Sequence, residues 1–243
     1  MSELSEQRAM RRIGHKGADH IAPGNTVESF DAALAHGVDM IEFDVLPEHS
    51  DGTGRLFLAH DYKVLQRRRP LTLEDGLDHL CSEAYASIEL DVDLKLPGYE
   101  ERVIAALRER GLERRTLIST MEAASLPVVR AASDVVRLGW SVPKVRRNYL
   151  AHPFTKPLAQ ATVLGMRRTI PRQVARRMAA GEIDAVMSHQ ALVTPHFVRT
   201  VQSAGGELYV WTVDDATHIR RFESMGVSGV ITNDPRLFDS PNA

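Results

Sequence analysis

The chain has 243 residues, of which 43% are hydrophobic and 26% charged, and its formal net charge is −2. This composition is typical of a soluble globular protein and predicts neither a nucleic-acid binder nor an acidic tail. A single cysteine excludes an internal disulfide framework, the polar N-terminal segment shows no secretory signal, and no apolar run approaches the roughly 20 residues that cross a bilayer. We therefore expect one cytoplasmic domain over residues 1–243, with Cys81 packed near the end of a helix.

Strand and helix patterns alternate along the whole chain, with no linker and no repeat. Strands are predicted at Arg12–His15, Met40–Val45, Ser87–Lys95, Thr116–Ser119, Val135–Trp140, Ala185–Ser188, Leu208–Val213 and Gly229–Thr232. Helices are predicted at Thr26–His36, Leu73–Cys81, Tyr99–Arg110, Ala123–Ala132, Pro171–Ala180, Pro195–Ala204 and Asp215–Met225. Thr26 and Asp214 are expected to cap the first and last of these helices.

Eight strands separated by helices predict a (β/α)8 TIM barrel, an α/β fold of parallel strands. A further short strand ends at His60, and Asp51-Gly52 precedes it as a turn. We therefore expect a β-hairpin excursion after strand 2 that returns His60 to the level of Asp44. A doubly wound open sheet shows the same alternation, but no Gly-x-Gly-x-x-Gly follows any strand.

Glu42 and Asp44 occupy alternate positions of an otherwise apolar strand, so their side chains share one face. Two adjacent carboxylates repel each other and resist burial unless a cation lies between them. The third strand carries Glu89, Asp91, Asp93 and Lys95 on one face, which is the interior of a barrel. Asp93 and Lys95 are closest to the carboxyl end of this strand, where barrel active sites form. Glu89 and Asp91 lie lower and could pair with interior basic residues or lie near an open mouth. The alternative for all four residues is a buried salt-bridge network.

Oxygen ligands from Glu42, Asp44 and Asp93 suit a hard divalent cation, Mg2+ or Ca2+. A zinc site typically recruits Cys or His, and the chain has no Cys pair and no His-x-x-x-His. His15 and His60 lie at strand ends and are candidates for proton transfer, because imidazole titrates near neutral pH. Acids for a metal and imidazoles for protons together predict metal-assisted hydrolysis.

The sequence resembles the glycerophosphodiester phosphodiesterase family, whose pattern runs His-Arg, Glu-Asn, Glu-x-Asp and His-Asp. The matching residues are His15-Lys16, Gly24-Asn25, Glu42-Phe43-Asp44 and His60-Asp61. Leu90–Lys95 is similar to the family's Glu-x-Lys strand, and Val210–Asp214 and Gly229–Pro235 are similar to its last two strands. The resemblance covers residues 12 to 236 and implies a (β/α)8 barrel.

The resemblance also implies roles for individual residues. The three acids would hold the metal, and His15 and His60 would be general acid and base. Lys95 would contact the phosphate, and Trp211 would face the glycerol moiety. The reaction would convert a small-molecule glycerophosphodiester into sn-glycerol 3-phosphate and an alcohol through a cyclic phosphate.

Three residues depart from the family pattern. Lys16 replaces Arg, which keeps the charge but loses a bidentate contact with phosphate. Asp93 replaces Glu and shortens one metal ligand. Gly24 replaces the Glu beside Asn25, whose amide remains available to backbone or substrate.

Two other functions stay open at this stage. A lyso-lipid phosphodiesterase of the lysophospholipase D kind, with peripheral membrane contact, is suggested by the basic stretch Lys144–Arg177 and the loop Tyr149–Pro157. Gly24 and Lys16 suggest a barrel that binds a phosphodiester with little turnover. The sequence does not define the leaving alcohol, the preferred ion or the oligomeric state.

Overall fold

The computed structural model describes residues 9–67, 69–144 and 156–239. The strands are β1 Arg11–His15, β2 Met40–Pro47, β3 Leu56–Leu58, β4 Glu89–Leu94, β5 Thr116–Thr120, β6 Arg137–Val142, β7 Ala185–His189, β8 Glu207–Trp211 and β9 Gly229–Thr232. The α-helices are α1 Val27–Ala35, α2 Tyr62–Arg67, α3 Leu73–Leu80, α4 Glu100–Glu109, α5 Ser125–Ala132, α6 Lys156–Ala179, α7 Pro195–Ser203 and α8 Ala216–Ser224.

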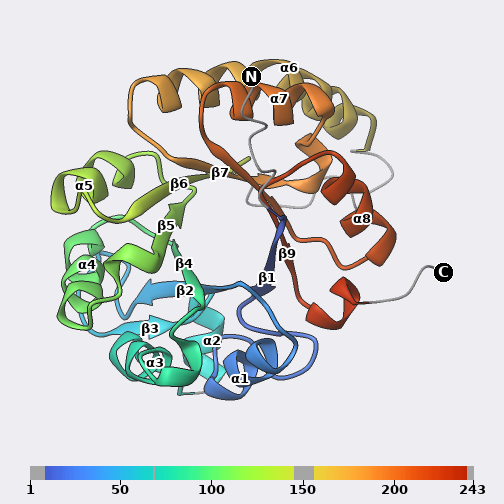
Figure 1. Ribbon diagram of the computed structural model, residues 1–243. Coiled ribbons are helices and arrows are strands. Elements are labelled where there is room, and N and C mark those ends of the chain that lie inside the picture. The colour runs from blue at the N-terminus through green and yellow to red at the C-terminus, as the bar shows by residue number, and fades with distance from the viewer. Residues whose placement is uncertain (1–8, 68, 145–155, 240–243) are drawn as a thin grey trace, which may run out of the picture.

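Eight parallel strands close into a barrel surrounded by helices (Figure 1). β1 pairs with β2 on one side and with β9 on the other, and this closure excludes an open sheet. β3 lies outside the cylinder and runs antiparallel to the end of β2, with Val45 paired to Leu58. The predicted (β/α)8 barrel and the hairpin after its second strand are therefore confirmed.

The barrel has an apolar interior layer and a charged floor. Ile13, Met40, Leu117, Ala185, Met187, Tyr209 and Ile231 form the interior layer. Below it, Glu89 pairs with Arg11 and Arg137, and Glu207 bonds both guanidinium groups. These pairs satisfy charges that would be costly alone inside a barrel. Ion pairs therefore occupy the end of the barrel at the amino ends of the strands, and the candidate site lies at the carboxyl ends.

The connecting segments differ from the predictions in four places. Helix α6 begins at Lys156 and contains Pro171, where the prediction began the helix. Helix α2 was not predicted, because none of its residues is buried and no periodic pattern marks it. Asp215, rather than Asp214, caps α8 through the His218 N–H. Cys81 is exposed rather than packed, with its thiol directed to the Arg110 carbonyl oxygen.

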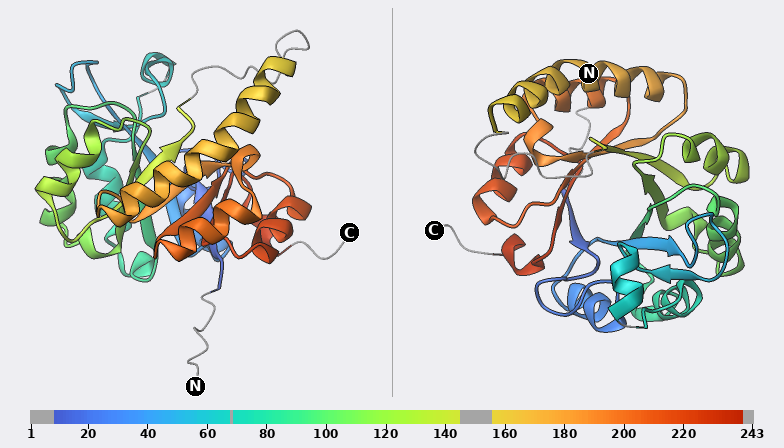
Figure 2. Two further views of the ribbon diagram at one scale, coloured as in Figure 1. Left: turned by 90° about the horizontal axis from the view of Figure 1, so that it is seen from above. Right: turned by 180° about the vertical axis from the view of Figure 1, so that it is seen from behind.

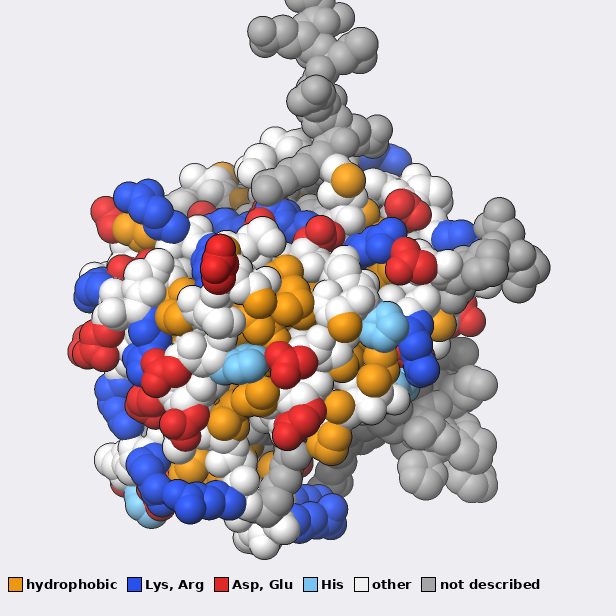
Figure 3. Space-filling model, turned by 60° about the horizontal axis from the view of Figure 1, so that its bottom comes forward, with side chains coloured by type: hydrophobic (Ala, Val, Ile, Leu, Met, Phe, Trp, Pro, Cys, Tyr) orange, Lys and Arg blue, Asp and Glu red, His pale blue; other side chains and the backbone are white. Residues whose placement is uncertain are grey.

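The outer surface is that of a solvated barrel. Figure 2 shows the helices around the sheet and the hairpin and the start of α6 projecting from the end opposite the N-terminus. The face in Figure 3 mixes acidic, basic and apolar side chains, with no single sign of charge dominating. Among the described residues, no helix is both long enough and apolar enough to span a membrane.

Candidate active site at the barrel mouth

Three carboxylates meet at the mouth, on the neighbouring strands β2 and β4. Asp44 is paired in register with Asp93, and Glu42 lies two residues before Asp44 on the same face. One oxygen of each carboxylate lies within 4.8 Å of the other two. Glu42 and Asp44 are buried, and Asp93 Oδ1 is a buried oxygen with no hydrogen-bond partner among the described residues. Three carboxylates with buried hard oxygens, one of which lacks a hydrogen-bond partner within the described part of the chain, fit a divalent cation.

The Lys95 side chain lies against this cluster. Its ammonium contacts both Asp44 and Asp93. Burial opposes ionisation of Asp44, but the Lys95 charge holds the pKa of that carboxyl well below its usual range. Burial, followed by repulsion from Asp44, raises the pKa of Glu42. The cluster thus has more acids than cations, and a further positive charge would stabilise it.

The loop after β1 forms hydrogen bonds with two of the same carboxylates. The Lys16 N–H donates to Glu42 Oε2 at 2.9 Å. Asn25 Nδ2 donates to Asp44 Oδ2 at 2.8 Å, and the Asp44 N–H donates back to Asn25 Oδ1 at 3.1 Å. Lys16 and Asn25 both have left-handed backbone, with φ of 51° and 61°, which is uncommon outside glycine and is maintained here by these bonds. Asn25 therefore orients a candidate metal ligand in this structure.

His15 is fixed by an asparagine that the sequence reasoning missed. Its Nδ1 contacts Asn233 Oδ1, while its Nε2 lies 3.8 Å from Glu42 Oε2. Asn233 Nδ2 donates to Asp214 Oδ2 at 2.6 Å, so the amide oxygen must face the imidazole. An amide oxygen accepts, so the His15 proton resides on Nδ1 and the Nε2 lone pair faces the mouth. Burial and the nearby Lys16 charge lower the pKa of His15, which favours this neutral form.

His60 reaches the mouth from the hairpin. It follows β3 and lies beside Asp61, with Nδ1 3.7 Å from Oδ2. Its side chain is 56% exposed, in contrast to the buried carboxylates. Because β3 runs antiparallel to β2 with Leu58 paired to Val45, His60 returns to the level of Asp44 at the carboxyl end of β2. The three acids and His15 therefore lie together, and His60 lies at the same end of the barrel on the hairpin.

Trp211 lies on the opposite side of the mouth, at the end of β8. Its indole is half-buried and packs edge-on against His189, with ring centroids 5.2 Å apart. His189 ends β7, and its Nδ1 accepts the Ala191 N–H at 3.1 Å. The sequence reasoning missed His189, because a lone histidine before a short 3-10 turn carries no pattern. Around the closed strand order, these two rings face β2 across the barrel, where they can contact the organic part of a substrate.

Asp91 lies below the acid cluster on β4. It is 1% exposed, and neither of its side-chain oxygens has a hydrogen-bond partner of normal geometry among the described residues. Burial raises the pKa of Asp91 to about 7, and the neighbouring Asp93 adds to the shift. Its position and protonation make it a structural acid beneath the site.

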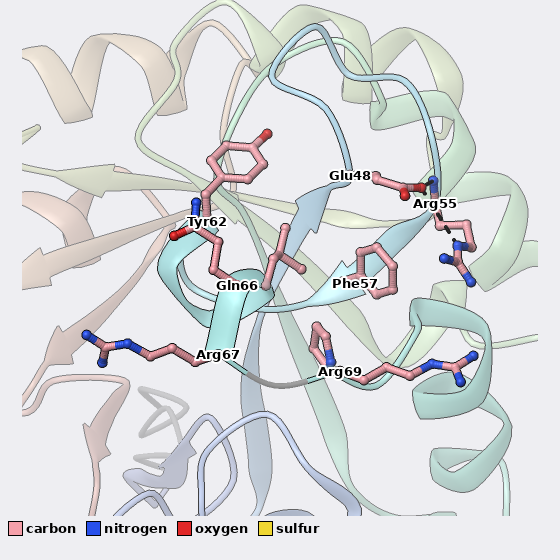
Figure 4. Close-up of a pocket in the computed structure, with 9 residues that line it drawn as sticks. Glu48, Arg55, Phe57, Tyr62, Gln66, Arg67 and Arg69 are labelled. Atoms are coloured by element: carbon pink, nitrogen blue, oxygen red, sulfur yellow. Dashed lines mark hydrogen bonds and ion pairs between the residues drawn. The ribbon is translucent and has the colours of Figure 1, made fainter.

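A separate hollow of about 690 Å³ lies between the hairpin and α2. Figure 4 shows its apolar floor at Phe57 and the arginines Arg55, Arg67 and Arg69 at its edge. None of its lining residues belongs to the predicted site. It is a feature of the hairpin, apart from the acid cluster.

The basic segment behind the lyso-lipid hypothesis is only partly described. Residues 145–155, with most of the loop Tyr149–Pro157, lie outside the described residues. In the described part, Lys144 pairs with Glu122 and Arg177 pairs with Glu182. Arg167 donates to the Ala191 carbonyl oxygen. These three basic residues interact within the chain, and the lyso-lipid hypothesis stays a prediction.

The model of the glycerophosphoryl diester phosphodiesterase family matches residues 15–67 and 72–237. The chain belongs to this family. It is therefore a phosphoric diester hydrolase, of the glycerophosphodiester phosphodiesterase kind. The family match ends just after Asp234-Pro235 and includes both histidines and all three acids.

Two curated relatives cover nearly the whole chain. The glycerophosphodiester phosphodiesterase of Caldanaerobacter subterraneus subsp. tengcongensis is 26% identical, over 92% of this chain and 93% of the relative. The glycerophosphodiester phosphodiesterase of Bacillus subtilis is 24% identical, over 97% of this chain and 87% of the relative. Both alignments cover more than nine tenths of this chain.

Two solved structures share the fold. One is a putative glycerophosphoryl diester phosphodiesterase from Silicibacter pomeroyi, with a TM-score of 0.71, 22% identity and coverage of 94% and 91% of the two chains. The other is an Oleispira antarctica phosphodiesterase in complex with its product sn-glycerol-3-phosphate, with a TM-score of 0.65, 19% identity and coverage of 94% and 96%. At these identities the likeness concerns the barrel itself.

Proposed function

We propose that this protein hydrolyses glycerophosphodiesters to sn-glycerol 3-phosphate and an alcohol. It would use a divalent cation held by Glu42, Asp44 and Asp93, with His15 and His60 as the proton-transfer groups. The convergence of these carboxylates and imidazoles at one barrel mouth carries the proposal. The Oleispira relative, whose structure contains sn-glycerol-3-phosphate, is consistent with this product.

The two histidines have different surroundings, and we assign them different roles. His15 is neutral, with its Nδ1 proton bound to Asn233 and its Nε2 lone pair free. It suits the general base that takes the proton from a glycerol hydroxyl as the hydroxyl oxygen attacks phosphorus. His60 is more exposed and stands beside Asp61, with its Nδ1 3.7 Å from Asp61 Oδ2. It suits the general acid that protonates the departing alcohol oxygen.

The remaining residues bind and orient the substrate. A cation held by the three acids, when bound, neutralises phosphate oxygens and polarises phosphorus. Lys95, whose ammonium contacts Asp44 and Asp93, and Lys16, whose ammonium pairs with Asp19, add ammonium donors for the phosphate. Trp211 offers an apolar face to the glycerol moiety. Attack by the glycerol hydroxyl gives a cyclic phosphate, and water then opens it with the histidine roles exchanged.

The test is hydrolysis of glycerophosphocholine by purified protein with Mg2+ or Ca2+, measured as release of sn-glycerol 3-phosphate. We expect His15→Ala and His60→Ala to lower kcat by roughly 10²–10⁴-fold each, as for other positioned proton-transfer groups. His196→Ala is the matched control, since His196 is exposed on α7 and outside the site. Full activity in either site variant, or activity that persists without any divalent ion, contradicts the proposed chemistry.

A further inference from the structure

Asp19 is a carboxylate near the mouth that no motif includes. It lies in the loop between His15 and Asn25, and its Oδ2 is 3.2 Å from Lys16 Nζ. Its Oδ1 accepts the Gly24 N–H at 2.8 Å. The side chains of Lys16 and Asp19 are 19% and 32% exposed. One carboxylate thus connects the lysine and the glycine that depart from the family pattern.

Gly24 leaves the space that this carboxylate occupies. A Cβ at position 24 would lie 2.6 Å from Asp19 Oδ1 and 2.8 Å from Lys16 Cβ, closer than such atoms approach. The φ of Gly24 lies outside the left-handed range, so contact rather than backbone strain makes glycine the residue that fits. The Glu-Asn pair in the resemblance would place a carboxylate at position 24. Here the carboxylate beside Lys16 comes from Asp19, five residues earlier.

The backbone of Lys16 is already fixed. Its N–H donates to Glu42, and its carbonyl oxygen accepts from the Asn25 N–H at 3.0 Å and from Ser29 Oγ at 2.6 Å. The freedom that remains lies in the flexible four-carbon side chain. Asp19 takes one of the three ammonium donors and leaves two for other oxygens.

We propose that Asp19 is a positioning residue that holds the Lys16 ammonium toward the substrate phosphate. This rests on the proposed function, in which Lys16 contacts that phosphate. Asp19 itself does not contact the substrate, because a carboxylate and a phosphate repel each other. Gly24 serves the same arrangement by leaving room for the carboxylate. Lys16, Asp19 and Gly24 therefore act as one unit in this chain.

A double-mutant cycle tests whether Asp19 acts through Lys16. The variants are Asp19→Asn, Lys16→Met and their combination, with KM and kcat measured on glycerophosphocholine and Mg2+. We expect Asp19→Asn to raise KM by about 2- to 5-fold, the upper range of a partly exposed ion pair, and to leave kcat within about 1.5-fold. In the Lys16→Met background, the same substitution should leave KM unchanged. Gly24→Ala, which displaces the carboxylate, should raise KM similarly and add little to Asp19→Asn.

Asp78→Asn is the matched control, because Asp78 pairs with Arg110 on the outer surface at 2.6 Å. It should leave KM unchanged, and all variants should keep the wild-type melting temperature within a few degrees. An equal KM rise with and without Lys16, or no rise at all, overturns the proposal. If the wild type is inactive, the proposed function fails separately, and the same cycle is read as the Kd for sn-glycerol 3-phosphate by calorimetry. Absence of any coupling in that Kd, or of any binding, then counts against Asp19.

Discussion

His15 and Asn233 contact each other across the junction of the first and last strands, which closes the barrel. The contact fixes the imidazole tautomer, because Asp214 fixes the Asn233 amide. A residue near each end of the chain is therefore needed to define one candidate general base. This relationship, rather than the strand alone, determines which nitrogen of His15 faces the mouth.

The first prediction concerns Asn233. Asn233→Ala removes the acceptor for the Nδ1 proton, so the imidazole can adopt the other tautomer. We expect kcat to fall about tenfold, the effect of one lost hydrogen bond of about 1.4 kcal/mol, with little change in KM. Steady-state kinetics of the wild type and the Asn233→Ala variant measure this effect. A rise in KM with unchanged kcat would instead indicate that Asn233 contacts the substrate.

The second prediction concerns the pH dependence of kcat/KM. Burial first, and the Lys16 charge second, lower the pKa of His15, so the basic form of His15 persists to lower pH than in an ordinary histidine. Removing the positive charge in Lys16→Met should raise the pKa of His15 and move the acid limb of the profile to higher pH. Lys63→Met, on the exposed helix α2, should leave the acid limb of the pH profile unchanged. A shift to lower pH in Lys16→Met contradicts the assignment.

The third prediction concerns metal removal. Chelation should abolish hydrolysis, and Mg2+ or Ca2+ at 100 times its Kd should stabilise the fold by about 2.7 kcal/mol. Asp93→Asn should remove most of the metal-dependent rise in melting temperature, because it neutralises one of three ligands. Calorimetry with and without metal provides the measurement, and Asp239→Asn, remote from the mouth, is the control. An equal rise in the two variants would place the ion elsewhere.

The fourth prediction concerns Asp91 and stability. Burial raises the pKa of Asp91 to about 7 in the folded state, so the folded protein binds more protons than the unfolded chain between about pH 4 and pH 7. The contribution of Asp91 to stability is therefore present at low pH and is lost as the pH rises through about 7. Asp91→Asn should raise the melting temperature by about 3–6 °C at pH 8 and by much less at pH 5. A larger gain at pH 5 than at pH 8 would reverse this sign.

The sequence predicted the barrel and the acids because both depend on repeating patterns. Alternating charges on β4 share a face in any strand, and the carboxyl ends of parallel strands meet at one mouth. Glu42, Asp44 and Asp93 could therefore be placed together without coordinates. His60 could be placed as well, because the Asp51-Gly52 turn fixed the direction of the hairpin.

Other parts of the site could not be predicted in this way. Asn233, His189 and Asp19 are single polar residues in loops or at a strand end, where no repeating pattern constrains the direction of a side chain. Asp214 is a residue type that commonly caps helices, but its side-chain oxygen accepts hydrogen bonds from Thr232 and Asn233 instead. Tertiary contacts between distant segments decided these cases, whereas helix α2 has no buried face that a periodic pattern could mark.

In the sheet, β3 pairs with the end of β2 and is not one of the eight barrel strands. His60 therefore follows a hairpin strand outside the barrel. Under the proposed chemistry, reshaping that hairpin arm would move the general acid while the three acids and His15 stay in place. The proposed base and ion site thereby belong to the barrel strands and the loop after β1, and the proposed acid belongs to the hairpin. New substrate ranges can arise by remodelling one short arm.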